Sequence, residues 1–212
     1  MNKILFIDTL TTGLHHERCA IYQIGGIICQ ENEEQIVEKV RFSLAVKPFD
    51  GARINENSLA IGSVTRGVLL TYPKQEDAFK TFYNIITDHI TVERSDDKIY
   101  IAGFNAAGFD VPFISNWFRR NDSTRFRDCF YVQTIDLMCL AALALKNERF
   151  SMQSFQLGAV ASRLGVNPIV NDKYSCLDNA ETSLEMYKEL CRRMRINDFT
   201  SHEKTVRIIK NF

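Results

Sequence analysis

The sequence lacks several features that would each point to a class of protein. Its 26 basic and 26 acidic residues leave no net charge, so any binding to nucleic acid needs a local basic patch or metal ions. The six cysteines form no CxxC pair and have no zinc-site spacing, and we expect them to be reduced core residues. There is no apolar run of 18 residues and no signal-peptide pattern, which predicts a cytoplasmic protein with no membrane association.

The chain does contain enough apolar residues for one sizeable core. Hydrophobic residues make up 45% of its 212 positions. Internal repeats and long linkers rich in glycine, serine or proline are absent from the sequence. We therefore expect one domain over residues 1–194, followed by a C-terminal extension over residues 195–212.

Hydrophobic periodicity predicts an α/β fold. Strands are expected at residues 3–8, 19–30, 36–46, 98–102 and 130–135. Helical segments are expected at residues 58–67, 74–90, 109–120, 137–146, 154–164 and 175–194. The first three strands follow one another, whereas helices separate the last two, so we expect a mixed five-stranded sheet covered by helices.

An acidic residue ends the first expected strand. The apolar run 4–7 is followed directly by Asp8. Burial of a carboxylate is costly unless a partner compensates it. Asp8 therefore predicts a bound metal, a hydrogen-bond donor or a turn at this point.

Three further acids lie near the starts of expected helices. Asp110 and Asp178 each fall in a first helical turn, where the helix dipole favours a negative charge. Each could therefore be a plain helix-start residue or a metal ligand. Asp136 directly precedes a helix, and N-capping is the simpler interpretation there. Trp117 shares an apolar helix face with Phe113, and we expect it in the core.

Three short motifs occur in order along the chain. Residues 8–13 (DTLTTG) resemble the first motif of the DEDD 3′–5′ exonucleases, acid-x-Glu-Thr-x-Gly. Residues 105–113 (NAAGFDVPF) resemble the second motif, and residues 173–178 (KYSCLD) resemble the third. On this ordered set, spread over residues 3–194, the chain is identified as a member of the DnaQ-like exonuclease superfamily. It is similar to the proofreading, epsilon-like subunit of bacterial replicative DNA polymerases.

The resemblance implies a fold, a metal site and a substrate. The fold would be the ribonuclease H-like one, a mixed five-stranded sheet with helices on both faces. Mg²⁺ or Mn²⁺ would be bound by Asp8, Asp110 and Asp178. Tyr174 or Lys173 would stand at the position of the catalytic base. The partner would be the 3′ end of single-stranded DNA or RNA, contacted by Thr11, Thr12, Phe104 and Asn105, with a polymerase or another protein as a further partner.

Two positions depart from the family pattern. Leu10 stands where the first motif has its second metal-binding acid, and Lys173 stands where one subclass has its catalytic histidine. Leucine cannot ligate a metal, and an ordinary lysine is protonated at neutral pH and cannot act as a base. We therefore expect binding of a nucleic-acid end with weakened or lost hydrolysis. An active two-metal exonuclease and a protein-interaction scaffold remain as alternatives.

Overall fold

The computed structural model describes residues 1–169 and 175–197. One five-stranded sheet runs through the molecule in the order β3-β2-β1-β4-β5. β1 pairs antiparallel with β2 and parallel with β4, so the sheet is mixed, as the sequence predicted. The strands are β1 (Asn2–Thr11), β2 (Ile21–Glu31), β3 (Ile36–Ala45), β4 (Tyr100–Gly103) and β5 (Ile135–Asp136).

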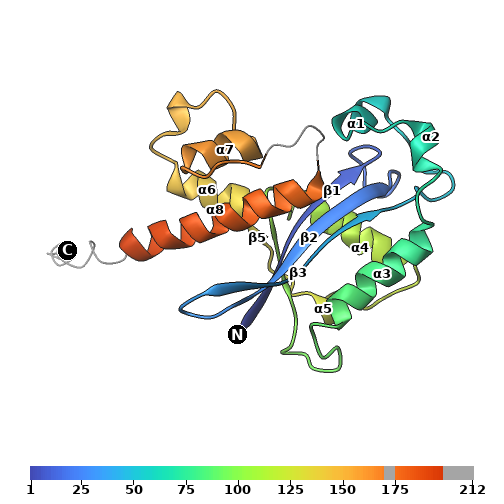
Figure 1. Cartoon of the computed structure of the whole chain (residues 1–212), viewed down its shortest axis with the longest axis horizontal. Coiled ribbons are helices and arrows are strands. Elements are labelled where there is room, and N and C mark those ends of the chain that lie inside the picture. The colour runs from blue at the N-terminus through green and yellow to red at the C-terminus, as the bar shows by residue number, and fades with distance from the viewer. Residues whose placement is uncertain (170–174, 198–212) are drawn as a thin grey trace, which may run out of the picture.

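Helices cover both faces of this sheet, with α8 crossing one face and α3 and α4 lying on the other (Figure 1). Within the described part of the chain, no helix is both long and apolar enough to cross a membrane. The helices are α1 (Glu56–Ile61), α2 (Arg66–Leu69), α3 (Gln75–Thr87), α4 (Asp110–Arg120), α5 (Phe126–Cys129), α6 (Leu137–Ala144), the short 3₁₀ helix η1 (Arg149–Ser151), α7 (Leu157–Arg163) and α8 (Cys176–Asn197).

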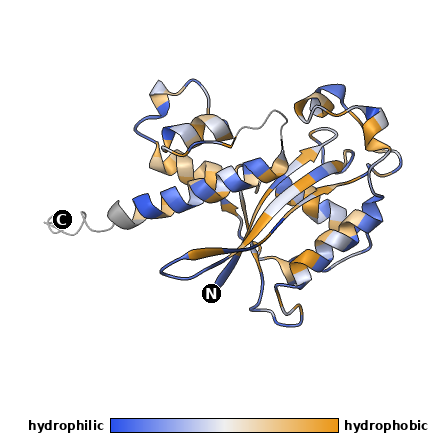
Figure 2. Ribbon diagram, viewed as in Figure 1, coloured by the Kyte–Doolittle hydropathy of each residue, from blue (hydrophilic) through white to orange (hydrophobic). Residues whose placement is uncertain are grey.

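The central strand β1 separates two hydrophobic cores. Successive side chains of a strand point to opposite faces, so Ile4 and Phe6 pack under α6, α7 and α8. Leu5 and Ile7 pack under α3 and α4. Figure 2 shows the consequence, hydrophobic central strands beneath helices whose outer sides are hydrophilic.

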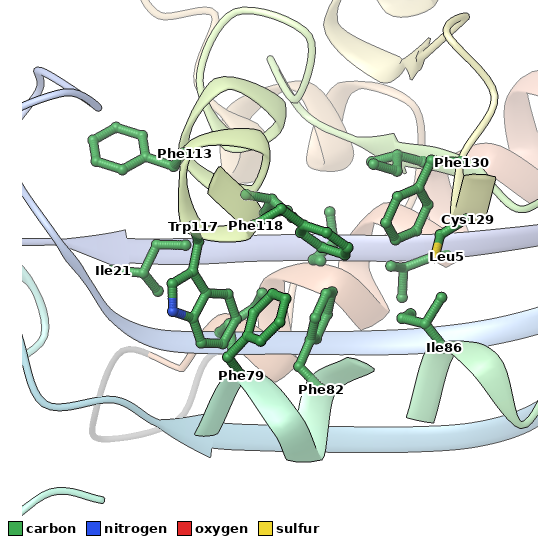
Figure 3. Packing of buried hydrophobic residues seen from close by; sticks show 14 of the residues in the cluster. Leu5, Ile21, Phe79, Phe82, Ile86, Phe113, Trp117, Phe118, Cys129 and Phe130 are labelled. Carbon is green, nitrogen blue, oxygen red and sulfur yellow. The ribbon is translucent and has the colours of Figure 1, made fainter. Parts of the chain in front are cut away.

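Aromatic side chains dominate the core under α3 and α4 (Figure 3). The rings of Phe79 and Phe118 meet edge to face, with centroids 4.9 Å apart and planes at 88°, a favoured geometry for aromatic pairs. Trp117 is only 4% exposed and contacts Phe79 and Phe82. Trp117 is therefore a core residue, as expected from its apolar helix face.

The expected single helix at residues 58–67 is wrong. Two short helices, α1 and α2, replace it, because several residues in this segment favour the start or the end of a helix over its continuation. The side chain of Asn55 caps the start of α1, and the side chain of Thr65 caps the start of α2. Between the two helices, Gly62 follows the end of α1 and Ser63 has a left-handed φ of 53°, which stops the first helix before the second begins.

The fifth strand is shorter than expected. Only Ile135 and Asp136 pair with β4, and Phe130 makes one isolated bridge to Ile99. The strand breaks off because the residues between them turn toward solvent, where Val132 is 73% exposed. Patterning also gave no signal for α5 or η1. At the other end of the chain, α8 runs to Asn197, past the expected domain boundary at residue 194.

Candidate functional site

A glycine in β2 brings the start of α8 onto the end of β1. Gly25 lies opposite Asp8 in the antiparallel ladder. A Cβ atom at Gly25 would lie 2.4 Å from the backbone nitrogen of Leu177, so any other residue would push α8 away. The close approach places the first turn of α8 beside Asp8, and Asn179 Nδ2 donates to Asp8 Oδ2 at 3.3 Å.

Asp110 occupies the first position of α4 and is 3% exposed. Thr9 Oγ1 donates a hydrogen bond to Asp110 Oδ1 at 2.6 Å. Burial, followed by the negative charge of Asp8, raises the pKa of Asp110 well above its usual range. Two carboxylates thus share one poorly hydrated corner of the molecule, where holding both charges at once is unfavourable.

The same surroundings act on Asp8. Burial raises the pKa of Asp8 from its ordinary 3.8 to about 7, and hydrogen bonds from the side chains of Asn179 and Cys176 offset part of that rise. Burial and the negative charge of Asp8 also raise the pKa of the Cys176 thiol well above its usual value. Near neutral pH the Asp8 carboxyl therefore exchanges readily between its charged and neutral forms.

A cleft of about 650 Å³ opens over Asp8 and Asp178. Its walls come from the β4–α4 loop, the α6–α7 connection and the start of α8. Phe104 and Phe155 line it and also pack against the core beneath, with their ring centroids 6.4 Å apart. The residues that line the cleft are Asp8, Phe104, Asn105, Met138, Phe155, Gln156, Leu157, Gly158, Pro168, Ile169, Ser175, Asp178, Asn179 and Thr182.

The residues expected to contact nucleic acid divide into two pairs. Phe104 and Asn105 line the cleft. Thr11 and Thr12 do not line the cleft, and their hydroxyls donate to backbone carbonyls within the fold. Thr11 Oγ1 donates to the carbonyl of Gly13 at 2.7 Å, and Thr12 Oγ1 donates to the carbonyl of Arg53 at 2.6 Å. Thr12 is fully buried, so its side chain is not available to a ligand, and contact of the backbone around Thr11 and Thr12 with a 3′-terminal nucleotide stays a prediction.

The expected base position lies outside the described residues, because Lys173 and Tyr174 fall in the gap between residues 169 and 175. Asp136 is described, and it caps α6 by accepting from the backbone nitrogen of Met138 at 3.0 Å. It also accepts from the backbone nitrogens of Asn105 and Ala107. The capping interpretation of Asp136 is therefore confirmed, and its carboxylate also fixes the β4–α4 loop that forms one cleft wall.

Leu10 is not among the residues that line the cleft. It is 6% exposed and belongs to a separate apolar cluster with Tyr22, Leu59, Leu69 and Cys176. α1 and α2 cover this cluster. The family position of the second acid is therefore filled by a well-packed side chain under these two helices.

The donor set does not fit a centre of two divalent ions. Such a centre needs several carboxylates converging on ions about 3.5–4 Å apart. Among the described residues, no group of three or more histidine, cysteine, aspartate or glutamate side chains is arranged to hold a metal ion. Binding of Mg²⁺ or Mn²⁺ by Asp8, Asp110 and Asp178, at low occupancy, stays a prediction.

Sequence reasoning missed four residues of this site. Thr9 and Asn179 are hydrogen-bonded to the two carboxylates, and Cys176 lies beside Asp8. Asn179 follows an expected site residue directly, so its place in the chain was a usable signal. Phe155 carried no signal, because only the path of the α6–α7 connection brings it to Phe104.

Known proteins resemble this chain in sequence or in fold. DNA polymerase III PolC-type from Thermotoga petrophila is 24% identical over 189 residues, which cover 89% of this chain but only 12% of that protein. E. coli exonuclease I, solved with a dT13 oligonucleotide, superposes with a TM-score of 0.71 at 18% identity, over 94% of this chain and 43% of that one. Its zinc-bound complex with single-stranded DNA superposes with a TM-score of 0.69 at 19% identity, over 94% and 42%.

The chain therefore spans less than half of each of these proteins. The RNase_T family model, described as an exonuclease, matches residues 5–187, which is most of the chain. Together with the ordered motifs and the five-stranded fold, this match shows that the chain belongs to the exonuclease family, within the DnaQ-like 3′–5′ exonuclease superfamily.

Proposed function

We propose that this domain binds the 3′ end of single-stranded DNA or RNA in the cleft and that its metal-dependent hydrolysis is weak or lost. The observation that carries the proposal is the pairing of an aromatic cleft wall with an incomplete set of acids. Phe104 and Phe155 offer faces for bases, and stacking on aromatic side chains is the usual sequence-tolerant contact to single strands. Family membership and a structural relative that holds an oligonucleotide support this choice of ligand.

Three features support weak hydrolysis. Leu10 is packed in an apolar cluster where the family pattern has an acid. In the absence of a cation, burial raises the pKa of Asp8 to about 7, so a metal ion that binds near neutral pH has to displace a proton from this carboxyl. Asp110 is almost fully buried. Each kcal/mol of lost transition-state stabilisation lowers the rate about fivefold, so a missing ligand has a large effect on turnover.

One observation favours a second candidate, an active exonuclease. Asp8 lies close to Asp110 and shares the cleft with Asp178, so three of the four acid positions of the family gather at one end of the sheet. Association with a polymerase stays a prediction, since the PolC-type relative is far longer than this chain.

Binding and cleavage of end-labelled oligonucleotides test the proposal directly. The native chain should bind (dT)₁₆ in equilibrium anisotropy and leave its 3′ end intact with Mg²⁺ or Mn²⁺. Leu10→Glu tests whether the missing fourth acid is what limits cleavage. Leu10→Gln is the matched uncharged control. Metal-dependent release of nucleotides by the native chain, abolished by Asp110→Asn, would establish the second candidate. Absence of any binding to single-stranded DNA or RNA would refute the proposed function.

A further inference from the structure

Three chain segments meet around the loop that joins β1 to β2. They are residues 14–19, residues 46–53 and residues 116–120, and together they form what we call the β1–β2 loop surface. The backbone nitrogen of Arg53 donates to the carbonyl of Arg18 at 2.7 Å. Asn116 Nδ2 donates to the carbonyl of His16 at 2.5 Å. These contacts hold the three segments together as one surface.

This surface is positively charged on a chain with no net charge. It carries two carboxylates, Glu17 and Asp50, against five cations, which gives it a formal charge of +3. The four arginines are exposed and the lysine is half-buried. The five cations are Arg18, Lys47, Arg53, Arg119 and Arg120.

Neutral groups hold two of these arginines in place. The Arg120 guanidinium lies 3.6 Å from the centroid of the Phe49 ring and donates to the backbone carbonyl of Glu17. Arg119 Nη2 donates to Asn116 Oδ1 at 3.0 Å. None of the five cations forms an ion pair within residues 1–169 and 175–197. Their charge is therefore uncompensated and available to a polyanion.

The cleft, in contrast, has acidic side chains in its lining and lacks basic ones among the described residues. The acids are Asp8 and Asp178. A strand whose 3′ end enters the cleft must find cations for its phosphates elsewhere on the chain. The β1–β2 loop surface follows β1 along the chain, since β1 ends at Thr11 and the surface begins at residue 14. Thr11 lies three residues beyond Asp8, and at 3.3 Å per residue that is a rise of about 10 Å.

We propose that the β1–β2 loop surface binds phosphates of single-stranded nucleic acid upstream of the 3′ end held in the cleft. The inference rests on the proposed function of the cleft. It adds a second contact region, which only an oligonucleotide long enough to leave the cleft can reach.

Oligonucleotide length and salt dependence separate the two regions. The full chain is compared with R18Q/R53Q, using 5′-labelled (dT)₄ and (dT)₁₆ over a series of salt concentrations. Losing two phosphate contacts to a single strand should flatten the slope of log K against log salt by about 1.4. If the two proteins bind equally at 1 M salt, that is roughly a 25-fold loss of affinity at 0.1 M salt. (dT)₄ should bind both proteins equally.

R125Q/R127Q is the matched control, because it removes two exposed arginines at α5, at the opposite end of the sheet (Figure 1). It should leave the binding of both oligonucleotides unaffected.

Binding of (dT)₁₆ with the same affinity and salt slope in R18Q/R53Q as in the native chain would overturn the inference and leave the proposed function standing. Failure of the native chain to bind either oligonucleotide would overturn both. A glutamate-rich peptide that binds the native chain but not R18Q/R53Q, while (dT)₁₆ binding is unchanged, would assign the surface to an acidic protein instead.

Discussion

Replacing Asp8 with asparagine should make the protein more stable at pH 8. The Asp8 carboxyl has a folded-state pKa of about 7 against an ordinary 3.8, so the folded chain favours its protonated form. The destabilisation is absent below about pH 4, grows as the pH rises to 7, and is constant above that. Asparagine is neutral throughout, and its side-chain oxygen can still accept the hydrogen bond from Asn179.

The shift spans about three pH units at 1.36 kcal/mol each, which sets an upper bound of about 4 kcal/mol. The carboxylate borders the cleft, where water and nearby donors reduce the penalty, so we expect a gain of about 2 kcal/mol at pH 8. The gain should fall toward zero as the pH approaches 4. Removing the charge at position 8 also lowers the pKa of Asp110, whose rise depends partly on Asp8.

Urea unfolding at pH 5 and pH 8, followed by circular dichroism with EDTA present, measures the free energy of unfolding of both proteins. Asp50→Asn, which changes an exposed carboxylate, is the matched control and should have little effect at either pH. A variant Asp8→Asn that is less stable than the native chain at pH 8 would refute the reasoning. It would mean that a positive partner stabilises the ionised Asp8.

Three further predictions concern the cleft and its frame. Gly25→Ala should lower the free energy of unfolding by about 1–3 kcal/mol or more in urea, because the new Cβ would clash with the first turn of α8; an unchanged stability would show that α8 can shift freely. Phe155→Ala should weaken (dT)₄ binding by about 1–3 kcal/mol in anisotropy, as expected for one lost stacking face; equal affinity would place the bases elsewhere. Addition of 1 mM Mg²⁺ should leave the Tm within about 1 °C of its value in EDTA, because an ion with a Kd above about 10 mM contributes less than about 0.1 kcal/mol at that concentration; a clear rise in Tm would show a site that binds metal well.

The sequence predicted the sheet well because its signals were local. The apolar run of β1 and the separation of β4 and β5 by helices required a mixed sheet, which the structure confirms. Patterning failed where single residues decide an element's end, as with Asn55 and Thr65 around α1 and α2. Those caps act through one hydrogen bond each, which hydrophobic periodicity does not register.

The site was only partly accessible from the sequence. Asp8, Asp110 and Asp178 were singled out because they fall in the three motifs that resemble those of the DEDD exonucleases. The surroundings that set the charge of these acids depend on tertiary contacts that no local sequence pattern reveals. An example is the hydrogen bond from Thr9 to Asp110, which are 101 residues apart in the chain. The hydroxyl of Thr12 shows the same dependence, because the carbonyl of Arg53 that accepts its hydrogen bond lies 41 residues away.

The packing of Leu10 has a consequence for protein engineering. Its neighbours Tyr22, Leu59 and Cys176 form an apolar environment suited to an isobutyl group, and a carboxylate at this position would meet them before it met solvent. Glutamate at this position would therefore be penalised unless Tyr22 and the helices that cover the cluster change as well. Installing a fourth acid calls for redesign of the whole cluster, because a single substitution leaves the apolar surroundings in place.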